Sequence, residues 1–360
     1  MLRLTTWTLS CILIDKIRRG TTTENNKISA NSKGAMLKSI SPLLFFLQKE
    51  SAVKVMPMVI LDQVAVMALL IMIGFLCRHF NIISDEANDK LSGFVINIVN
   101  PAMILQAYQI KFDMNKLHGL AVTFGLSVLS YVLAIIVSAL FAKTDEADTS
   151  IEKFSIVYSN CGFMGIPLIN GLYGSDGVFY LTGYLTAFNL MVWTHGVATV
   201  CGKIKKEDLK NILLSPTLIA TLIGIILFVC RLSFPKVIYT TVGYVAEMNT
   251  PLAMIISGVT VYSTDFRQAC KNRKIYKTCA AKLLIVPLTV MLVFTFIPCS
   301  AQLKNIVIIA TACPTAVTGF ILAMKYKKDY MYSSQIFTIS TLVSLATLPL
   351  IKLICQGIVK

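Results

Sequence analysis

Residues 159–167, which read SNCGFMGIP, place two glycines, an asparagine and a proline inside an otherwise apolar run. A proline inside a helix removes one backbone hydrogen bond, and its ring clashes with the carbonyl four residues earlier. We therefore expect any helix here to open around Gly162 and Gly165, ahead of Pro167. Backbone groups freed at a helix end are suited to binding anions.

A second run has the same feature at residues 311–315, which read TACPT. Pro314 should open that helix in the same way. Each opening would expose the N-terminal end of a half-helix, which carries roughly half a positive charge and N–H groups that suit a carboxylate. The residues that the two segments offer to an anion are Asn160, Cys161, Gly162, Gly165, Pro167, Thr311, Cys313, Pro314 and Thr315.

Asn160 is the strongest single candidate for binding, because its side-chain amide can donate a hydrogen bond to a carboxylate. The alternative is that Asn160 only caps the freed backbone of the opened helix, as asparagine often does where a helix starts. The residue types alone leave both interpretations open.

Two further apolar runs carry polar residues near a proline: Asn97 and Asn100 in one, and Glu247 and Asn249 in the other. We predict that these residues support the site or couple it to a proton or a sodium ion. An ionisable residue inside a membrane is costly and usually functional, which favours Glu247 as the coupling group. The alternative places Glu247 near the outer headgroups, because its run begins only about ten residues earlier.

Membrane helices are the elements that must position these residues. The chain has 360 residues, of which 56% are hydrophobic and 14% are charged, and its mean hydropathy is +0.72. A soluble domain carries about a quarter charged residues, whereas about 20 apolar residues form one membrane helix. The chain therefore predicts an all-α polytopic protein in a lipid bilayer, with ten spans at about 58–77, 91–110, 118–141, 154–173, 177–200, 213–230, 236–262, 279–298, 304–324 and 333–354.

The polar and proline-containing breaks fall in the second and seventh spans and in the fourth and ninth, so corresponding spans are five apart. An odd number of spans per copy inverts the second copy. We therefore predict a five-plus-five inverted repeat in which broken helices four and nine cross. The predicted divisions are an N-terminal extension at 1–55 that is weakly structured or not native, a first repeat at 56–201, a cytoplasmic linker at 202–212 and a second repeat at 213–360.

Basic residues in short loops favour the cytoplasmic side of a membrane. If the first span enters from outside and residues 1–55 are left out of the count, seventeen Lys and Arg residues, Lys282 and Lys325 among them, face the cytoplasm and seven face the outside. Both termini are therefore predicted outside. The net charge of +15 then reflects helix ends that face anionic lipid headgroups, and no nucleic-acid partner is expected.

The ionisable residues argue against an enzyme. Catalysis needs paired carboxylates, a Ser/His/Asp set or a metal cluster, whereas only isolated ionisable residues lie in the apolar runs. The ten cysteines form no C-x-x-C pair and no Cys/His cluster with ligand spacing, so neither a metal nor a cofactor is expected.

Five separated motifs occur in order along the chain: NPA at 100–102, SNCGFMGIPLINGLYG at 159–174, SPTLIATLIG at 215–224, TPLAM at 250–254 and LAMKY at 322–326. Together they resemble the auxin efflux carrier family, which includes plant auxin exporters and bacterial malate or malonate permeases. The resemblance covers about residues 58–355. The short loop at 202–211 is similar to the bacterial branch, because the plant long carriers have a large hydrophilic insertion there.

This resemblance implies a scaffold domain and a crossover domain, the latter built on helices four and nine, in a fold like that of bile-acid symporters. It implies a secondary transporter in the plasma membrane that moves a small organic anion, such as a dicarboxylate or an auxin-like carboxylate, by an elevator-like movement. It also implies a homodimer and a carboxylate-binding role for Asn160, although Ser159 stands where the plant carriers have proline.

Two other transport classes stay open at this point. A sodium-coupled organic-anion symporter of the bile-acid type would need carbonyl or carboxylate oxygens close enough to coordinate the ion. Sodium-dependent uptake would identify that class. A channel would instead show a conductance too fast for alternating access.

Overall fold

The computed structural model describes residues 61–142, 149–202 and 214–358. The predictions for residues 1–55 and for residues 203–212 of the linker lie outside these ranges. Within them the regular structure is helical, and the one β contact is an isolated antiparallel bridge between Ser159 and Thr315. The predicted all-α membrane architecture is therefore confirmed, while the number of crossings and the inverted repeat stay predictions.

The described part of the chain begins with a helix at Leu61–His79, followed by α3 (Asp85–Phe94), the π-helix η1 (Val95–Val99), α4 (Asn100–Ala107) and α5 (Met114–Phe141). Side-chain caps set where these helices start, since each cap accepts from a backbone N–H that has no partner inside the helix. Ser84 Oγ accepts from Ala87 N at 3.2 Å at the start of α3, and Asp113 caps α5.

The next elements are α6 (Thr149–Val157), the π-helix η2 (Cys161–Gly165), α7 (Ile166–Met191), the π-helix η3 (Val192–Gly196) and α8 (Val197–Cys201). A bend divides α7 at Gly174, where φ is 63° and ψ is −158°. Glycine adopts this conformation without the strain that a Cβ would add. The bend lies between the predicted spans 154–173 and 177–200, so it separates two predicted crossings.

The second half contains α10 (Pro216–Val229), α11 (Lys236–Glu247), α12 (Asn249–Tyr262), α13 (Phe266–Lys271), α14 (Arg273–Ala280), the π-helix η4 (Ala281–Ile285), α15 (Val286–Thr295), α16 (Ala301–Ala312), α17 (Thr318–Lys325) and α18 (Tyr330–Ile358). Four helical stretches of the described residues are long and apolar enough to cross a membrane: Leu61–His79, Met114–Phe141, Arg273–Thr295 and Tyr330–Cys355. The shorter apolar helices α10 and α16 lie in two further predicted spans.

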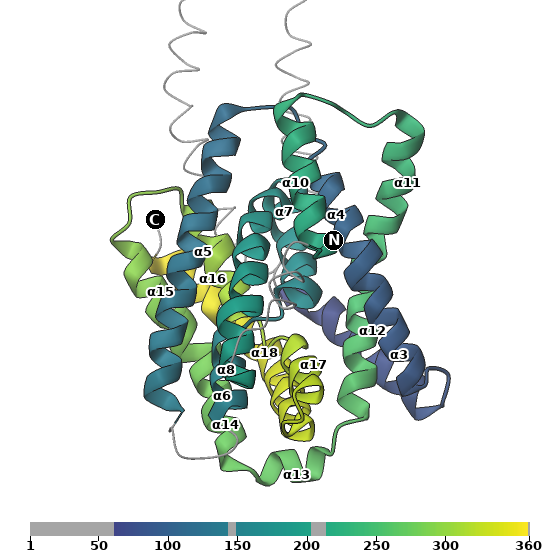
Figure 1. Cartoon of the computed structure of the whole chain (residues 1–360), viewed down its shortest axis with the longest axis vertical. Helices are drawn as coiled ribbons and strands as arrows, with labels where there is room; N and C mark the ends of the chain where they lie inside the picture. The colour runs from purple at the N-terminus through teal and green to yellow at the C-terminus, as the bar shows by residue number, and fades with distance from the viewer. Residues whose placement is uncertain (1–60, 143–148, 203–213, 359–360) are drawn as a thin grey trace, which may run out of the picture. The chain divides into compact units, whose positions relative to one another are not determined.

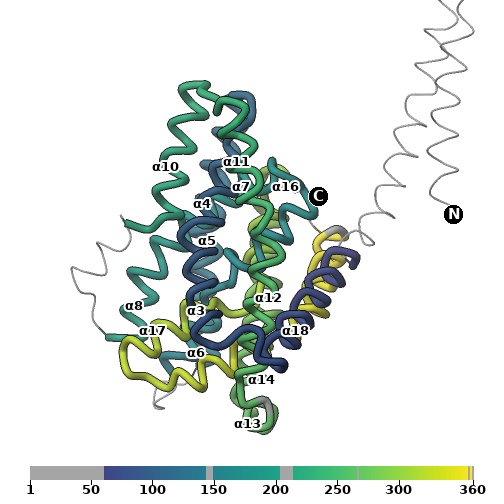
Figure 2. The backbone as a smooth tube through the Cα atoms, turned by 90° about the vertical axis from the view of Figure 1, so that its right-hand side faces the viewer, coloured from purple at the N-terminus to yellow at the C-terminus, as the bar shows by residue number. Residues whose placement is uncertain are grey.

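The helices of the described region pack in two neighbouring groups. Helix α5 packs against α7 and α16, whereas α4 packs against α10 and α11, and α12 packs against α3 (Figure 1). Helices α13, α14 and α17 lie toward one end of this region, and α11 lies toward the other in both views (Figure 2). Helix α7 touches both groups, so the broken segment that precedes it lies between them.

Gly258 lets α12 pack directly against the backbone of the Leu61–His79 helix. A Cβ at this position would overlap the carbonyl oxygen of Ile71 and lie 2.8 Å from the N of Phe75. Gly74 makes the reciprocal contact with the backbone of Ile255. Small residues of this kind allow close helix contact in membranes, where van der Waals packing replaces the hydrophobic effect as the driving force.

Candidate functional site

Two unwound segments meet at the centre of the site. Asn160 N donates to the carbonyl of Pro314 at 2.7 Å, and Ala316 N donates to the carbonyl of Tyr158 at 3.0 Å. These two hydrogen bonds make the antiparallel bridge between Ser159 and Thr315. The two broken helices therefore cross, and each satisfies backbone groups that the other has freed.

The first opening lies earlier in the chain than the sequence predicts. Helix α6 ends at Val157, and residues 161–165 are already helical as η2, so the opening is at 158–160 and not around Gly162 and Gly165. Residues 161–165 form the wide π turn of η2, which runs directly into α7 and takes Pro167 into the helix, so the chain does not open next to the proline. The second opening contains Pro314, as predicted, because α16 ends at Ala312 and α17 begins at Thr318.

Side-chain hydroxyl groups on both unwound segments form further hydrogen bonds at the crossing. Ser159 Oγ donates to the carbonyl of Thr311 at 3.0 Å, and Thr315 Oγ1 donates to the carbonyl of Ser155 at 3.0 Å. Ser340 Oγ accepts from Thr315 N at 3.2 Å. Since Ser159 and Thr315 are fully buried, these bonds satisfy backbone groups that water cannot reach.

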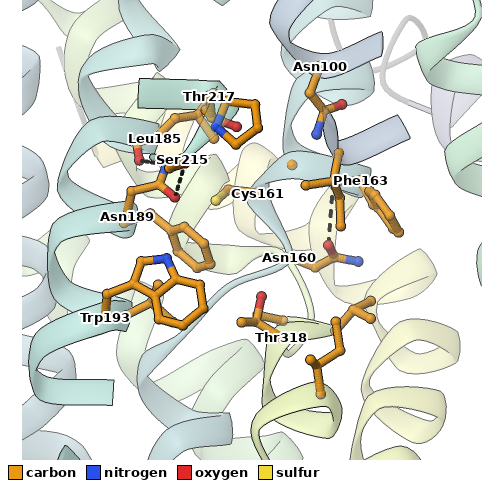
Figure 3. Close-up of a pocket in the computed structure, with 18 of the residues that line it drawn as sticks. Asn100, Asn160, Cys161, Phe163, Leu185, Asn189, Trp193, Ser215, Thr217 and Thr318 are labelled. Atoms are coloured by element: carbon orange, nitrogen blue, oxygen red, sulfur yellow. Dashed lines mark hydrogen bonds between the residues drawn. The ribbon is translucent and has the colours of Figure 1, made fainter. Parts of the chain in front are cut away.

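A cavity of about 400 Å³ lies beside the crossing (Figure 3). Of the predicted site residues, it is lined by Asn97, Asn100, Asn160, Cys161 and Gly162. Figure 3 shows Asn160 and Asn100 on one side of the cavity and Asn189 and Trp193 on the other. The structure therefore brings the start of the fourth predicted span together with polar residues of the second and fifth.

The remaining predicted binding residues do not line this cavity: Gly165, Pro167, Thr311, Cys313, Pro314 and Thr315. Two of their side chains bond back to their own helix, since Thr311 Oγ1 donates to Val307 O at 2.8 Å and Cys313 Sγ to Ile309 O at 3.4 Å. On the second segment, the residues after the crossing replace them, and Ala316, Val317 and Thr318 form part of the wall.

The side chain of Asn160 does two things in this structure. Its Oδ1 accepts from Phe163 N at 3.4 Å, which caps η2. Its Nδ2 is buried and has no hydrogen-bond partner among the described residues. A buried donor without a partner costs about 1–3 kcal/mol, so a ligand oxygen that reached Nδ2 would recover that energy.

Lys325 gives the cavity its charge. It is the only charged residue among the described residues that line the cavity, and it is exposed at the end of α17. Its Nζ lies 6.0 Å from the centre of the Trp193 ring, which also lines the cavity. Since none of the described residues in this wall carries a carboxylate, Lys325 favours a negatively charged solute over a cation here.

Comparison with known proteins places most of the described region in one family. The model of the membrane transport protein family matches residues 59–352, which is most of the chain. The chain belongs to this family. This confirms the resemblance to the auxin efflux carriers on which the sequence prediction depended.

The similar proteins are transporters by name. Uncharacterized transporters of Methanothermobacter thermautotrophicus and Methanocaldococcus jannaschii are 23% and 24% identical, and the matches cover 80% and 79% of this chain and 96% and 95% of those proteins. A protein of Rhizobium meliloti named "Putative malonate transporter" is 21% identical, with 80% of this chain and 93% of that protein covered. This family membership makes the chain a membrane transport protein.

One polar residue of the predicted second span is hydrogen-bonded to one of the predicted seventh span. Asn249 Nδ2 donates to Asn100 Oδ1 at 2.6 Å, and Asn249 is fully buried behind the cavity wall. Glu247 does not join them, because it is exposed and lines a second cavity of about 240 Å³ farther along α4, together with Gln106. The structure therefore does not bring Glu247 to the crossing.

Lys282 lies at the crossing, although the sequence predicts it among the lysines that face the cytoplasm. Its side chain is fully buried, and its Nζ donates to Ser159 Oγ at 2.6 Å and to Val157 O at 3.4 Å. The prediction was wrong because the helix begins at Arg273, not near 279. Lys282 therefore lies roughly 14 Å along the helix axis, at the depth of the crossing.

Proposed function

We propose that this membrane transport protein is a secondary transporter that moves a small organic anion of the dicarboxylate class. Movement would follow an alternating-access cycle of the elevator type in the plasma membrane. The observation that carries the proposal is the cavity beside the crossing. Among the described residues, its wall combines one cation, Lys325, with the buried amide nitrogen of Asn160, which has no hydrogen-bond partner.

The size and chemistry of the cavity support a small anion. Ligand pockets typically have volumes of about 300–1,000 Å³, with mostly apolar walls and a few polar groups that fix orientation. This cavity, at about 400 Å³, lies at the lower end of that range. A short dicarboxylate could place one carboxylate near Asn160 and the other toward Lys325, and the name of the Rhizobium relative supplies malonate as the first compound to test.

The arrangement of the crossing supports a moving element. The two unwound segments are joined to each other by hydrogen bonds, so α6, η2, α16 and α17 form one connected unit beside the cavity. Helices α4 and α10 are a second unit that also lines the cavity, through Asn100 and Thr217. Displacement of the first unit along the second would carry a bound anion across the membrane.

A thermal-stability screen of the purified protein tests the proposal. We expect malonate or malate to raise the melting temperature in proportion to the logarithm of its concentration, because a ligand that binds only the folded state stabilises it by mass action. Indole-3-acetate tests the auxin-like alternative, and tetraethylammonium serves as the cation control. If no carboxylate shifts the melting temperature, the assignment of an organic-anion site is wrong.

A further inference from the structure

Lys282 is the most unusual ionisable residue in the described part of the chain. Its side chain has 0% exposure, and no salt bridge to it exists among the described residues. A buried charge without a partner inside a membrane is costly and marks a functional position. Family membership and the proposed anion site do not by themselves explain why a lysine lies there.

The position of Nζ is the first step of the argument. It binds the carbonyl of Val157, which is the last residue of α6, and so it lies at the negative end of a half-helix. It also binds Ser159 Oγ, which in turn donates to the carbonyl of Thr311, near the end of the other half-helix. In transporters with broken helices, such C-terminal ends and unwound carbonyls hold the coupling cation.

The second step concerns what else could hold a cation here. An ion such as sodium needs several oxygen ligands at once, and two of the oxygens at this point already accept from Lys282. The ammonium therefore fills the place of a diffusible ion. Glu247, the candidate coupling residue of the sequence analysis, lines a different cavity and does not contact the crossing.

The third step concerns the groups that surround Lys282. Two thiols, Cys161 and Cys313, are close enough to interact with it electrostatically, and Tyr184 donates to Ser159 Oγ at 3.5 Å. On the helices that pack against η4, Glu152 of α6 is the only carboxylate within the described residues, and it accepts from Tyr332. Among the described residues, therefore, no fixed negative charge lies against Nζ to offset the charge of the ammonium. An anion in the adjoining cavity would offset it.

We propose that Lys282 is the coupling residue of this transporter, and that the proton on its amine takes the place of a diffusible cation at the crossing. Ser159 connects Lys282 to the cavity where the anion would bind, because its Oγ accepts from Nζ and the residue also lines the cavity next to Asn160. A proton that binds the neutral amine forms the ammonium as the anion enters, and it leaves when the anion is released. One proton then accompanies each anion, and sodium is not required. This proposal rests on the proposed function.

Transport by reconstituted protein tests the proposal, with radiolabelled malonate as the probe. The variants are Lys282→Met, which removes the charge but keeps an unbranched side chain, and Lys352→Met as the matched control. Lys352 is equally buried, but it binds Tyr173 away from the crossing. Exchange of malonate for malonate is measured separately from accumulation driven by a pH gradient, in sodium chloride and in choline chloride.

We expect the native protein and the Lys352→Met variant to accumulate malonate about tenfold per unit of pH gradient, equally in both salts. Lys282→Met should still exchange malonate but should show no accumulation driven by the gradient. Undiminished accumulation by Lys282→Met, or a requirement of the native protein for sodium, would overturn the proposal.

Proton counting decides the case in which Lys282→Met neither folds nor exchanges. In weakly buffered detergent solution, a pH-indicator dye should report about one proton taken up per malonate bound by the native protein. Lys282→Arg, whose guanidinium does not release its proton, should bind malonate without proton uptake. Binding by the native protein with no proton uptake would overturn the proposal.

Failure of the proposed function has a different signature. If no carboxylate binds the native protein, the organic-anion site is wrong, and Lys282 is then tested on the protein alone. The difference in melting temperature between native protein and Lys282→Met should change between about pH 5 and pH 9, because a titrating group links stability to pH. A constant difference over that range would refute the role of Lys282 as a proton carrier.

Discussion

At the scale of single residues, the site depends on one unsatisfied hydrogen-bond donor and one cation. The sequence leaves open whether Asn160 caps a helix or binds the substrate, and the structure is compatible with both. Its oxygen caps η2, while its nitrogen has no hydrogen-bond partner among the described residues. Lys325 supplies the positive charge of the cavity wall. Under the proposed function, these two residues would bind a carboxylate in preference to a neutral or cationic solute, without selecting one particular anion.

Replacement of Asn160 by alanine should weaken malonate binding by about tenfold to a hundredfold, because a hydrogen bond to a charged group is worth about 1.5–3 kcal/mol. Isothermal titration of purified protein measures the change. Asn189→Ala is the matched control, because Asn189 lines the same cavity but already bonds Leu185 and Ser215. Equal losses in the two variants would show that the cavity wall matters and that the free amide does not.

Replacement of Lys325 by glutamine should weaken malonate binding by about two- to fivefold, and most at low salt, because exposed charges are screened. Lys328→Gln removes the same charge at the same end of the molecule without touching the cavity wall, so it should leave binding unchanged. Titrations at two salt concentrations make the comparison. If both variants weaken binding alike, the effect comes from overall charge and Lys325 is not part of the site.

At the scale of helices, close packing positions the crossing. The breaks in α6–α7 and α16–α17 leave these elements with fewer backbone bonds of their own, so neighbouring helices must hold them. Ser340 of α18 and Lys282 of η4 each bind one of the two unwound segments. The glycine contact between α12 and the Leu61–His79 helix leaves no room for a side chain between these two helices.

Gly258→Ala should destabilise the protein by about 1–3 kcal/mol, because the new methyl group would overlap the backbone of Ile71. The melting temperature in detergent should fall by several degrees. Gly125→Ala in α5 is the control, since a Cβ there meets nothing within 4 Å and alanine favours the helix. A Gly258→Ala variant as stable as Gly125→Ala would mean that the two helices are not in backbone contact.

At the scale of the whole molecule, the orientation in the membrane and the homodimer implied by the family resemblance stay predictions. Two exposed thiols can test the orientation. Cys230 follows α10 at the end of the described region where α11 begins, and Cys270 lies in α13 at the other end (Figures 1 and 2). If both termini are outside, Cys230 faces outward and Cys270 faces the cytoplasm.

A membrane-impermeant maleimide should therefore label Cys230 in intact cells and label Cys270 only after the cells are made permeable. Peptide mapping by mass spectrometry identifies the labelled residue, and the variants Cys230→Ser and Cys270→Ser confirm each assignment. The reverse pattern would place the termini in the cytoplasm.

The membrane class, the family and the interruption at Pro314 can be read from the sequence, because long apolar runs need lipid and Pro314 cannot continue a helix without cost. The other interruption, at 158–160, lies well before Pro167, so the proline does not mark its place. The pairing of Asn100 with Asn249 also has a local signal, because each precedes a proline in a corresponding span.

Only the tertiary structure decided which of these residues face the cavity and which close the crossing. Thr315 and Asn160 have similar polar character in the sequence, yet Thr315 bonds the backbone of α6 whereas the amide nitrogen of Asn160 remains free. Lys282 illustrates the limit most clearly, because a shift of six residues in the start of its helix moves it from the membrane surface to the crossing. The depth of a residue in the membrane and the direction in which its side chain points depend on contacts between distant segments. No local sequence pattern contains those contacts.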